Sequence, residues 1–152
     1  MGSEMCIRDR HTQIIDGTVC YVQLTADLKS SVGEVTTLFA GSSPFYIEPK
    51  PEGEHYITDG PFMYRTKDGI LLMIWSTFVK GKYAQCVAQS DNGEITGSFT
   101  HLPPLITDDG GHGMIFKTEK DLILTFHSPN QTGFERPVFK PIIDSGEGIR
   151  LK

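Results

Sequence analysis

The sequence has no long apolar run and no cluster of basic residues. Nothing in its 152 residues approaches the roughly 18-residue apolar segment of a membrane helix, which excludes that class of membrane protein. The 14 lysines and arginines are outnumbered by 19 aspartates and glutamates, and the formal net charge is −5. Binding to phosphate backbones needs a positively charged surface. We therefore expect neither a nucleic acid nor a membrane as partner.

Cysteine is scarce, and helical periodicity is missing. Apart from Cys6, the chain has only Cys20 and Cys86. Each stands in the middle of a strand-like run, without metal-ligand spacing, and we predict that both are buried apolar residues. No window of a dozen residues carries a helical apolar stripe free of glycine and proline. With 16 glycines, 9 prolines and 10% aromatic residues, the composition is typical of a turn-rich all-β protein.

The first ten residues form a separate segment. Residues 5–9 (MCIRD) have neither a strand nor a helix pattern, and they resemble the translation of a transposase adapter used in sequencing libraries. We predict that residues 1–10 are a non-native leader and that residues 11–152 are the protein proper, with its upstream part lost. A short native leader is the alternative.

Two stretches of the chain repeat one layout. Residues 64–76 align with residues 116–128 without a gap, at an offset of 52 positions (118 − 66). The identical pairs are Thr66 and Thr118, Leu72 and Leu124, and Ser76 and Ser128. Each copy reads as a strand, a polar turn and a second strand, preceded by glycine. Repeated hairpins predict neighbouring blades of a β-propeller. Two unrelated hairpins in a β-sandwich are the alternative.

Further strand-like runs extend both copies. Residues 83–90 and 98–106 complete the first blade, with Pro103 and Pro104 protecting its edge, and residues 136–143 follow the second hairpin. Residues 18–25 and 34–39 predict a partial blade before them, partly because Gly33-Glu34-Val35 resembles Gly93-Glu94-Ile95. A proline-rich surface loop is expected at 45–55, and the start of another blade at 148–152.

The predicted fold is thus all-β, a partial five-bladed β-propeller of about two and a half blades. Because a propeller is stabilised by closing its ring, an open half leaves apolar sheet faces uncovered. We expect the isolated chain to aggregate or to fold poorly.

Two polar side chains stand out at the glycine-rich entries to the repeated hairpins. Asp59 lies in Asp-Gly-Pro and His112 in Gly-Gly-His-Gly, at points that face the central channel of a propeller. Plain turn chemistry is the alternative for Asp59, and an ordinary loop histidine is the alternative for His112. His127 and Trp75 are predicted to be core residues. Arg136 begins a strand beside Glu135, and a solvated salt bridge between the two is one interpretation.

In combination, these motifs resemble a known family. The segments are TDGPFMYRTKDGILLMIWS, YAQCVAQSDNGEITGSF, GGHGMIF, FHSPN and ERPVF, and they are similar to the second half of glycoside hydrolase family 43 over residues 12–152. The resemblance implies a five-bladed propeller and inverting hydrolysis of glycosidic bonds by two carboxyl groups. The substrate would be an arabinose- or xylose-type, or related, plant polysaccharide or oligosaccharide.

The resemblance also implies roles for single residues. Asp59 occupies the position of the general acid, which is glutamate in the family's Glu-Gly-Pro motif, while His112 and Arg136 match substrate-binding residues. The general base would lie upstream of this chain, so the fragment alone is expected to be inactive. No cofactor is required; the family implies a central Ca²⁺ only in a complete protein, and no metal ligand is predicted here. It also implies a bacterial protein that is secreted, periplasmic or cytoplasmic. The Asp-for-Glu change keeps a non-catalytic carbohydrate-binding propeller open as an alternative, and a β-sandwich interaction module is a third.

Overall fold

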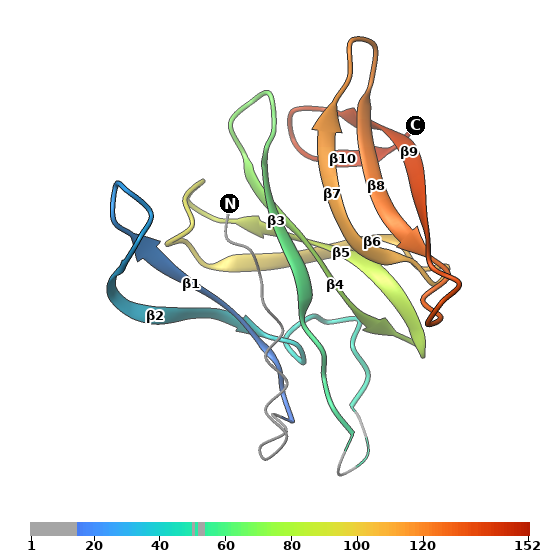
Figure 1. Ribbon diagram of the computed structural model, residues 1–152, viewed down its shortest axis with the longest axis horizontal. Coiled ribbons are helices and arrows are strands. Elements are labelled where there is room, and N and C mark those ends of the chain that lie inside the picture. Colours follow the sequence, from blue (N-terminus) through green and yellow to red (C-terminus); the bar gives the residue numbers. More distant parts are fainter. Residues whose placement is uncertain (1–14, 50, 52–53) are drawn as a thin grey trace.

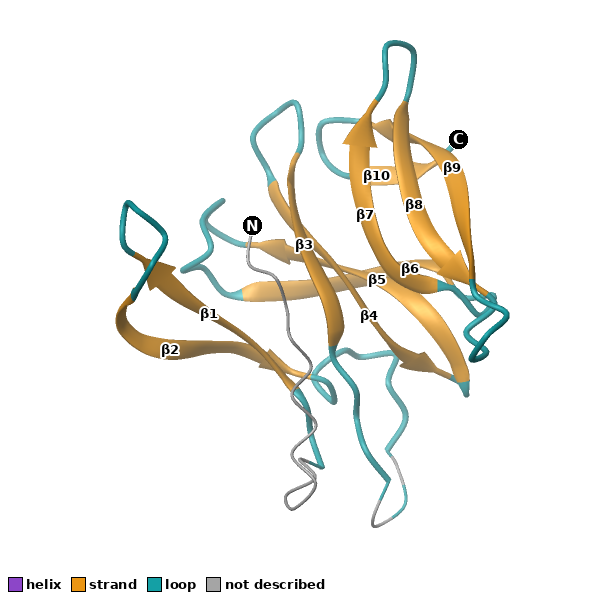
Figure 2. Ribbon diagram, viewed as in Figure 1, coloured by secondary structure: helices purple, strands orange, loops and turns teal. Residues whose placement is uncertain are grey.

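The computed structural model describes residues 15–49, 51 and 54–152, which form ten strands and no helix. The strands are β1 (Thr18–Leu24), β2 (Ser31–Ala40), β3 (Asp59–Arg65), β4 (Leu71–Val79), β5 (Lys82–Ser90), β6 (Phe99–Ile106), β7 (Gly111–Lys117), β8 (Leu122–Ser128), β9 (Arg136–Asp144) and β10 (Ile149–Leu151). Figure 2 shows strands joined by loops and turns in this part of the chain. No helix of membrane-spanning length and apolarity occurs in the described part. The predicted leader, residues 1–10, lies outside it.

The strands form three antiparallel sheets that follow one another along the chain. The first sheet pairs β1 with β2, the second has the order β3-β4-β5-β6, and the third has the order β10-β9-β8-β7. Figure 1 shows the sheets side by side as a fan, with β3 and β7 next to each other. The predicted all-β, partial propeller-like fold is confirmed, and a two-layer sandwich of the two hairpins is not what the chain forms.

The second sheet is covered on both faces. Met73 and Trp75 of β4 pack with Val19 and Phe39 of the first sheet, and the Phe39 and Trp75 ring centroids lie 5.1 Å apart. On the other face, Leu72 and Ile74 pack against the third sheet, together with Ile115, Leu124 and Phe126. This arrangement explains the continuous apolar run in β4, because strand residues alternate between faces and both faces here are buried.

The two hairpins repeat with a difference of one residue. Tyr64 pairs with Leu72 in the second sheet, whereas Phe116 pairs with Ile123 in the third. The polar turn is shorter in the second copy, since Thr66 N donates to Ile70 O but Thr118 N donates to Asp121 O.

The predicted gapless alignment is therefore right for the first strand and wrong by one residue for the second. A slip of one residue exchanges the two faces of a strand. Leu72 and Leu124 accordingly point toward each other across one interface.

Two smaller expectations are wrong. β10 pairs with β9 through Arg150 and Ile143, so residues 148–152 complete the third sheet instead of starting another. Cys20 is exposed, while Cys86 is buried as predicted, because β1 lies in a two-stranded sheet that nothing in the described chain covers from outside. The partial blade expected before the two copies is present as the β1–β2 sheet.

The outer face of the third sheet is apolar and uncovered by the described residues. Met114 is 47% exposed, Phe116 38% and Phe139 60%, and the two phenylalanine rings touch edge to face at 6.3 Å. In the second sheet the corresponding face is buried against the third. This open face is a physical basis for the predicted aggregation, which stays a prediction.

Candidate functional site

Two matching bulges bring the polar residues together. Asp59 pairs with Ser76 at the start of β3, and Gly111 pairs with His127 at the start of β7; in both ladders the register then shifts before regular pairing resumes. The residue after each of these starts has a left-handed backbone, with φ of 52° at Gly60 and 55° at His112. His112 therefore occupies a position that the preceding sheet fills with glycine.

A left-handed backbone costs a non-glycine residue about 1–2 kcal/mol, so the bulge at His112 has to be held in place. The N–H of His112 donates to Ser76 Oγ at 2.7 Å, and the N–H of Gly113 donates to Gln85 Oε1 at 2.7 Å. Both accepting side chains are fully buried, and Gln85 Nε2 in turn donates to Trp75 O at 3.0 Å. The second sheet thus fixes the backbone of the third sheet at the site.

The His112 ring lies on Gly60 and faces Asp59. A Cβ atom at Gly60 would come within 2.9 Å of two ring atoms of His112, so only glycine fits under the ring. His112 Nδ1 lies 3.2 Å from Asp59 Oδ1, and the Tyr83 hydroxyl donates to Asp59 Oδ2 at 2.7 Å. The Asp59 side chain is 24% exposed and that of His112 is 49% exposed. Asp59 is therefore the inner member of the pair.

The surroundings of Asp59 favour its ionised form. Burial raises the pKa of this carboxyl, but the hydrogen bonds from His112 and Tyr83, with the positive charge of His112, outweigh burial and hold the pKa below its ordinary value. A general acid needs a raised pKa at neutral pH, so these residues alone do not give Asp59 that property.

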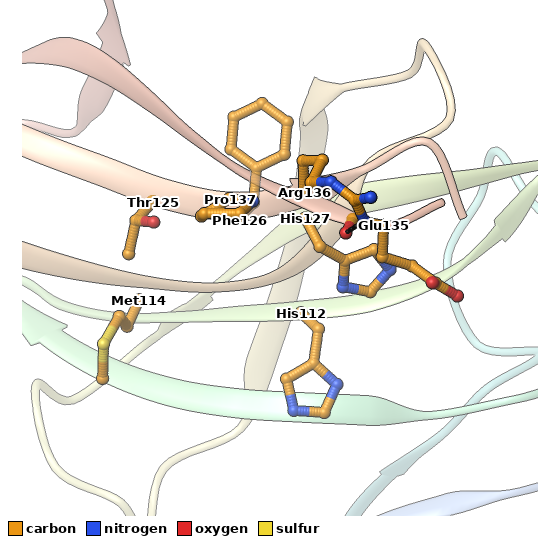
Figure 3. Close-up of a pocket in the computed structure, with 8 residues that line it drawn as sticks. All are labelled: His112, Met114, Thr125, Phe126, His127, Glu135, Arg136 and Pro137. Carbon is orange, nitrogen blue, oxygen red and sulfur yellow. Dashed lines mark hydrogen bonds between the residues drawn. The ribbon is translucent and has the colours of Figure 1, made fainter. Parts of the chain in front are cut away.

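His112 and Arg136 line one pocket of about 310 Å³ on the third sheet. Figure 3 shows His112 and His127 on one side of it, with Glu135 and Arg136 beside His127. The full lining is His112, Met114, Thr125, Phe126, His127, Glu135, Arg136 and Pro137. Asp59 does not line this pocket, but it contacts His112, which does. Arg136 Nη1 donates to the main-chain oxygen of Glu135 at 2.7 Å; the salt bridge considered between these two side chains does not form.

Tyr83 of β5 and His127 of β8 also belong to the site, although the sequence analysis named neither as a site residue. The Tyr83 ring stacks on the His127 ring, with 5.4 Å between the ring centroids and 16° between the ring planes. His127 Nε2 lies 3.0 Å from Asn130 Oδ1. His127 is half-buried rather than a core residue. In the actual register His127, and not Ser128, is the counterpart of Ser76, which the gapless alignment of the two repeats does not reveal.

Asp109 connects the loops behind these rings. Its carboxylate accepts from Tyr83 N at 3.4 Å and from Asn130 N at 3.1 Å, and its main-chain oxygen accepts from Ser128 Oγ at 3.0 Å. The strand that carries Tyr83 and the loop that carries Asn130 are thereby held at a fixed separation.

The described residues contain no group of three His, Cys, Asp or Glu side chains placed to hold a metal ion. Asp59, the acidic side chain in contact with His112, also contacts Tyr83, whereas Ca²⁺ takes six to eight oxygen ligands. These residues therefore do not by themselves fit the Ca²⁺ that the resemblance implies for a complete protein.

Three consecutive antiparallel sheets, the second and third of which begin with a polar bulge, define a partial β-propeller-like protein. The chain is similar to the crystal structure of an endo-arabinase from Bacteroides thetaiotaomicron, with 39% sequence identity and a TM-score of 0.77. The match covers 85% of this chain and 47% of that one, so the chain spans about half the length of the solved structure. No protein-family model matches the chain, and neither does any curated protein.

Proposed function

We propose that the chain is part of a glycoside hydrolase, resembling family 43, that cleaves arabinose-type polysaccharide. The observation that carries the proposal is the similarity, at 39% identity and over 85% of the chain, to an endo-arabinase. The reaction is inverting: an acid protonates the leaving oxygen while a carboxylate on the opposite face of the sugar activates water. Asp59 belongs to the acid side of the site, and His112 and Arg136 bind the sugar.

The direct contact between Asp59 and His112 supports this assignment, as does the pocket that His112 shares with Arg136. In the proposed enzyme the general base comes from a part of the protein outside residues 11–152. The chain by itself then binds sugar weakly and hydrolyses nothing.

The lowered pKa of Asp59 favours a second candidate, a carbohydrate-binding propeller without catalysis. Aspartate is one methylene shorter than the family's glutamate, and a misplacement of about 1 Å can slow a reaction about 100-fold. An ionised, short carboxylate is well suited to accept hydrogen bonds from sugar hydroxyls.

The test uses the protein encoded by the uninterrupted reading frame around this chain, incubated with linear arabinan. The enzyme proposal expects new reducing ends with inverted anomeric configuration, detected by NMR. It also expects Asp59→Asn to lower the rate at least about tenfold, while Glu119→Gln, at an exposed turn on the hairpin tip, leaves the rate unchanged. Binding of arabinan without cleavage would instead establish the second candidate, and no interaction with arabinan or xylan would reject both.

A further inference from the structure

We propose, resting on the function above, that His112 hands the proton to the leaving oxygen and that Asp59 acts through it as a positioning residue. The geometry points to this division of roles. His112 is half exposed and lines the pocket, whereas Asp59 is three-quarters buried behind it. Nδ1 of His112 faces Asp59, so the opposite ring nitrogen, Nε2, is the one directed away from the carboxylate.

The ring of His112 compensates for the short side chain at position 59. With aspartate in place of glutamate, the carboxyl group stays close to the β3 backbone. The space in front of it is taken by the imidazole, which rests on Gly60. An aspartate that orients a histidine and stabilises its protonated form is a recurring catalytic arrangement. Here the two members come from the corresponding bulges of two neighbouring sheets.

The backbone of His112 supports a functional reason for the residue. Strained backbone at a non-glycine residue persists where the surroundings enforce it, and such positions cluster at active sites. His112 has φ of 55° at a bulge where the second sheet uses glycine, and two buried side chains hold that bulge. Glycine would satisfy the backbone at lower cost, so the imidazole itself is what this position retains.

The proposed step balances as follows. The bond between the anomeric carbon and the leaving oxygen breaks, with its electron pair going to that oxygen, which takes the proton from Nε2 of the His112 imidazolium. A water molecule bonds to the anomeric carbon from the opposite face and gives its proton to a carboxylate base outside the described residues. His112 is left neutral, with its Nδ1 proton held toward Asp59. Solvent then returns one proton from the base to the imidazole.

Several groups around His112 set the pH range of this step. Asp59 from β3 favours the charged imidazole, as does Glu135, which lines the same pocket, while Arg136 from β9 opposes it. The Tyr83 hydroxyl from β5 holds the other oxygen of Asp59. The ring centroid of His127 from β8 lies 6.4 Å from that of His112.

The test uses His112→Gly in the complete protein, because glycine accepts a left-handed backbone and leaves a space beside Gly60. We expect arabinan hydrolysis to fall at least about 100-fold, the usual contribution of a positioned proton donor. An aryl arabinofuranoside with an acidic phenol needs little protonation and should lose less than about tenfold. Added imidazole should restore arabinan hydrolysis in the variant and leave the wild type unchanged.

Two further variants separate positioning from sugar binding. Asp59→Asn should move the basic limb of the pH–rate profile to lower pH, because the protonated imidazole loses its partner. Tyr83→Phe keeps the ring stacked on His127 but removes the hydrogen bond to Asp59. The carboxylate then keeps more negative charge toward His112, and the basic limb should move slightly to higher pH. A purely structural role of Asp59 would lower the rate without moving the profile.

An equal loss on both substrates would overturn the inference, because it would mean that His112 only holds the sugar. An unchanged rate in His112→Gly would also overturn it. So would a set of imidazole derivatives of different pKa that all restore arabinan hydrolysis equally well. If the wild type hydrolyses neither substrate, the proposed function fails, and the inference fails with it. Three measurements distinguish these results: the rate of the wild type, the ratio of the rates on the two substrates, and the effect of added imidazole on the variant.

Discussion

The second and third sheets begin with the same hairpin, yet one is buried on both faces and the other on one. Val87 in β5 is 3% exposed, while Phe139, which occupies the corresponding place in β9, is 60% exposed. Both positions carry apolar residues. The comparison teaches that each sheet carries two apolar faces, and that its place in the row of sheets decides which of them is covered.

The bulges differ in a complementary way. The second sheet presents an acid followed by glycine, whereas the third presents glycine followed by histidine. Gly111 leaves no room for a side chain, since a Cβ there would come within 2.7 Å of Ser76 Oγ and the Tyr83 ring. Asp59 and His112 thus come from adjacent positions of one repeated motif and meet because the two sheets are neighbours.

The largest expected difference between the sheets is in their cores. Leu72→Ala should lower the free energy of unfolding by about 2–5 kcal/mol, because it leaves a cavity between two sheets. Ile123→Ala, at the corresponding place on the open face, should cost clearly less, because water fills the space. Urea unfolding followed by circular dichroism measures both. Equal losses would mean that the outer face of the third sheet is covered in solution.

The hairpin turns offer a second matched pair. Thr66 is buried, and its hydroxyl donates to Gly146 O at 2.6 Å and accepts from Ile70 N, while Thr118 bonds only within its own exposed turn. Thr66→Val should cost about 1–3 kcal/mol, since it leaves a buried carbonyl without its donor, and Thr118→Val should cost about 1 kcal/mol or less. A larger loss at Thr118 in the same unfolding experiment would contradict the contact between the sheets at Thr66.

The bulge glycine is the third comparison. Gly60→Ala should cost about 1–2 kcal/mol through its left-handed backbone, and its Cβ would also push the His112 ring away from Asp59. His112→Gly should not carry the backbone penalty. Chemical shifts of the His112 ring, with Glu119→Gln as an unaffected control, report the displacement. An unmoved ring in Gly60→Ala would show that the site tolerates the extra methyl group.

The smallest effect is a dependence of stability on pH. Because the folded-state pKa of Asp59 is lowered, its carboxylate stabilises the fold above the unfolded value of about 3.9 and loses that contribution as pH falls through the folded-state pKa. For a partly exposed group the contribution is on the order of 1 kcal/mol or less. Asp59→Asn should therefore flatten the stability curve below about pH 4. A curve that keeps its slope would assign the dependence to other carboxylates, Asp144 among them.

Much of the fold follows from local patterns. Alternation, turn residues and the apolar run in β4 predict the strands and their order, because both faces of that strand are buried. The register of the second hairpin could not be predicted in this way, because a turn one residue shorter leaves the identities at Leu124 and Ser128 in place while exchanging the faces that they occupy. The position of β10 depends on its pairing with β9. A strand of three residues is too short for its sequence to predict that partner.

The candidate site was predictable only in part. Asp59 and His112 could be chosen because polar residues are few at the glycine-rich entries, and the two do touch. Arg136 could be chosen only from the family resemblance. Tyr83 gave no signal, because its contact with Asp59 joins strands β5 and β3, which are not direct neighbours in the sheet. The catalytic role of Asp59 and the substrate-binding roles of His112 and Arg136 stay predictions.

The single tryptophan gives the molecule a selective optical probe. Trp75 is fully buried, and it touches Phe39 of the first sheet and His101 of β6 on the face of the second sheet that points away from the third. Its emission should therefore respond when the first two sheets separate. Detachment of the third sheet alone would leave the fluorescence nearly unchanged. Thermal unfolding followed by tryptophan emission therefore reports on the interface between the first two sheets and not on the whole protein.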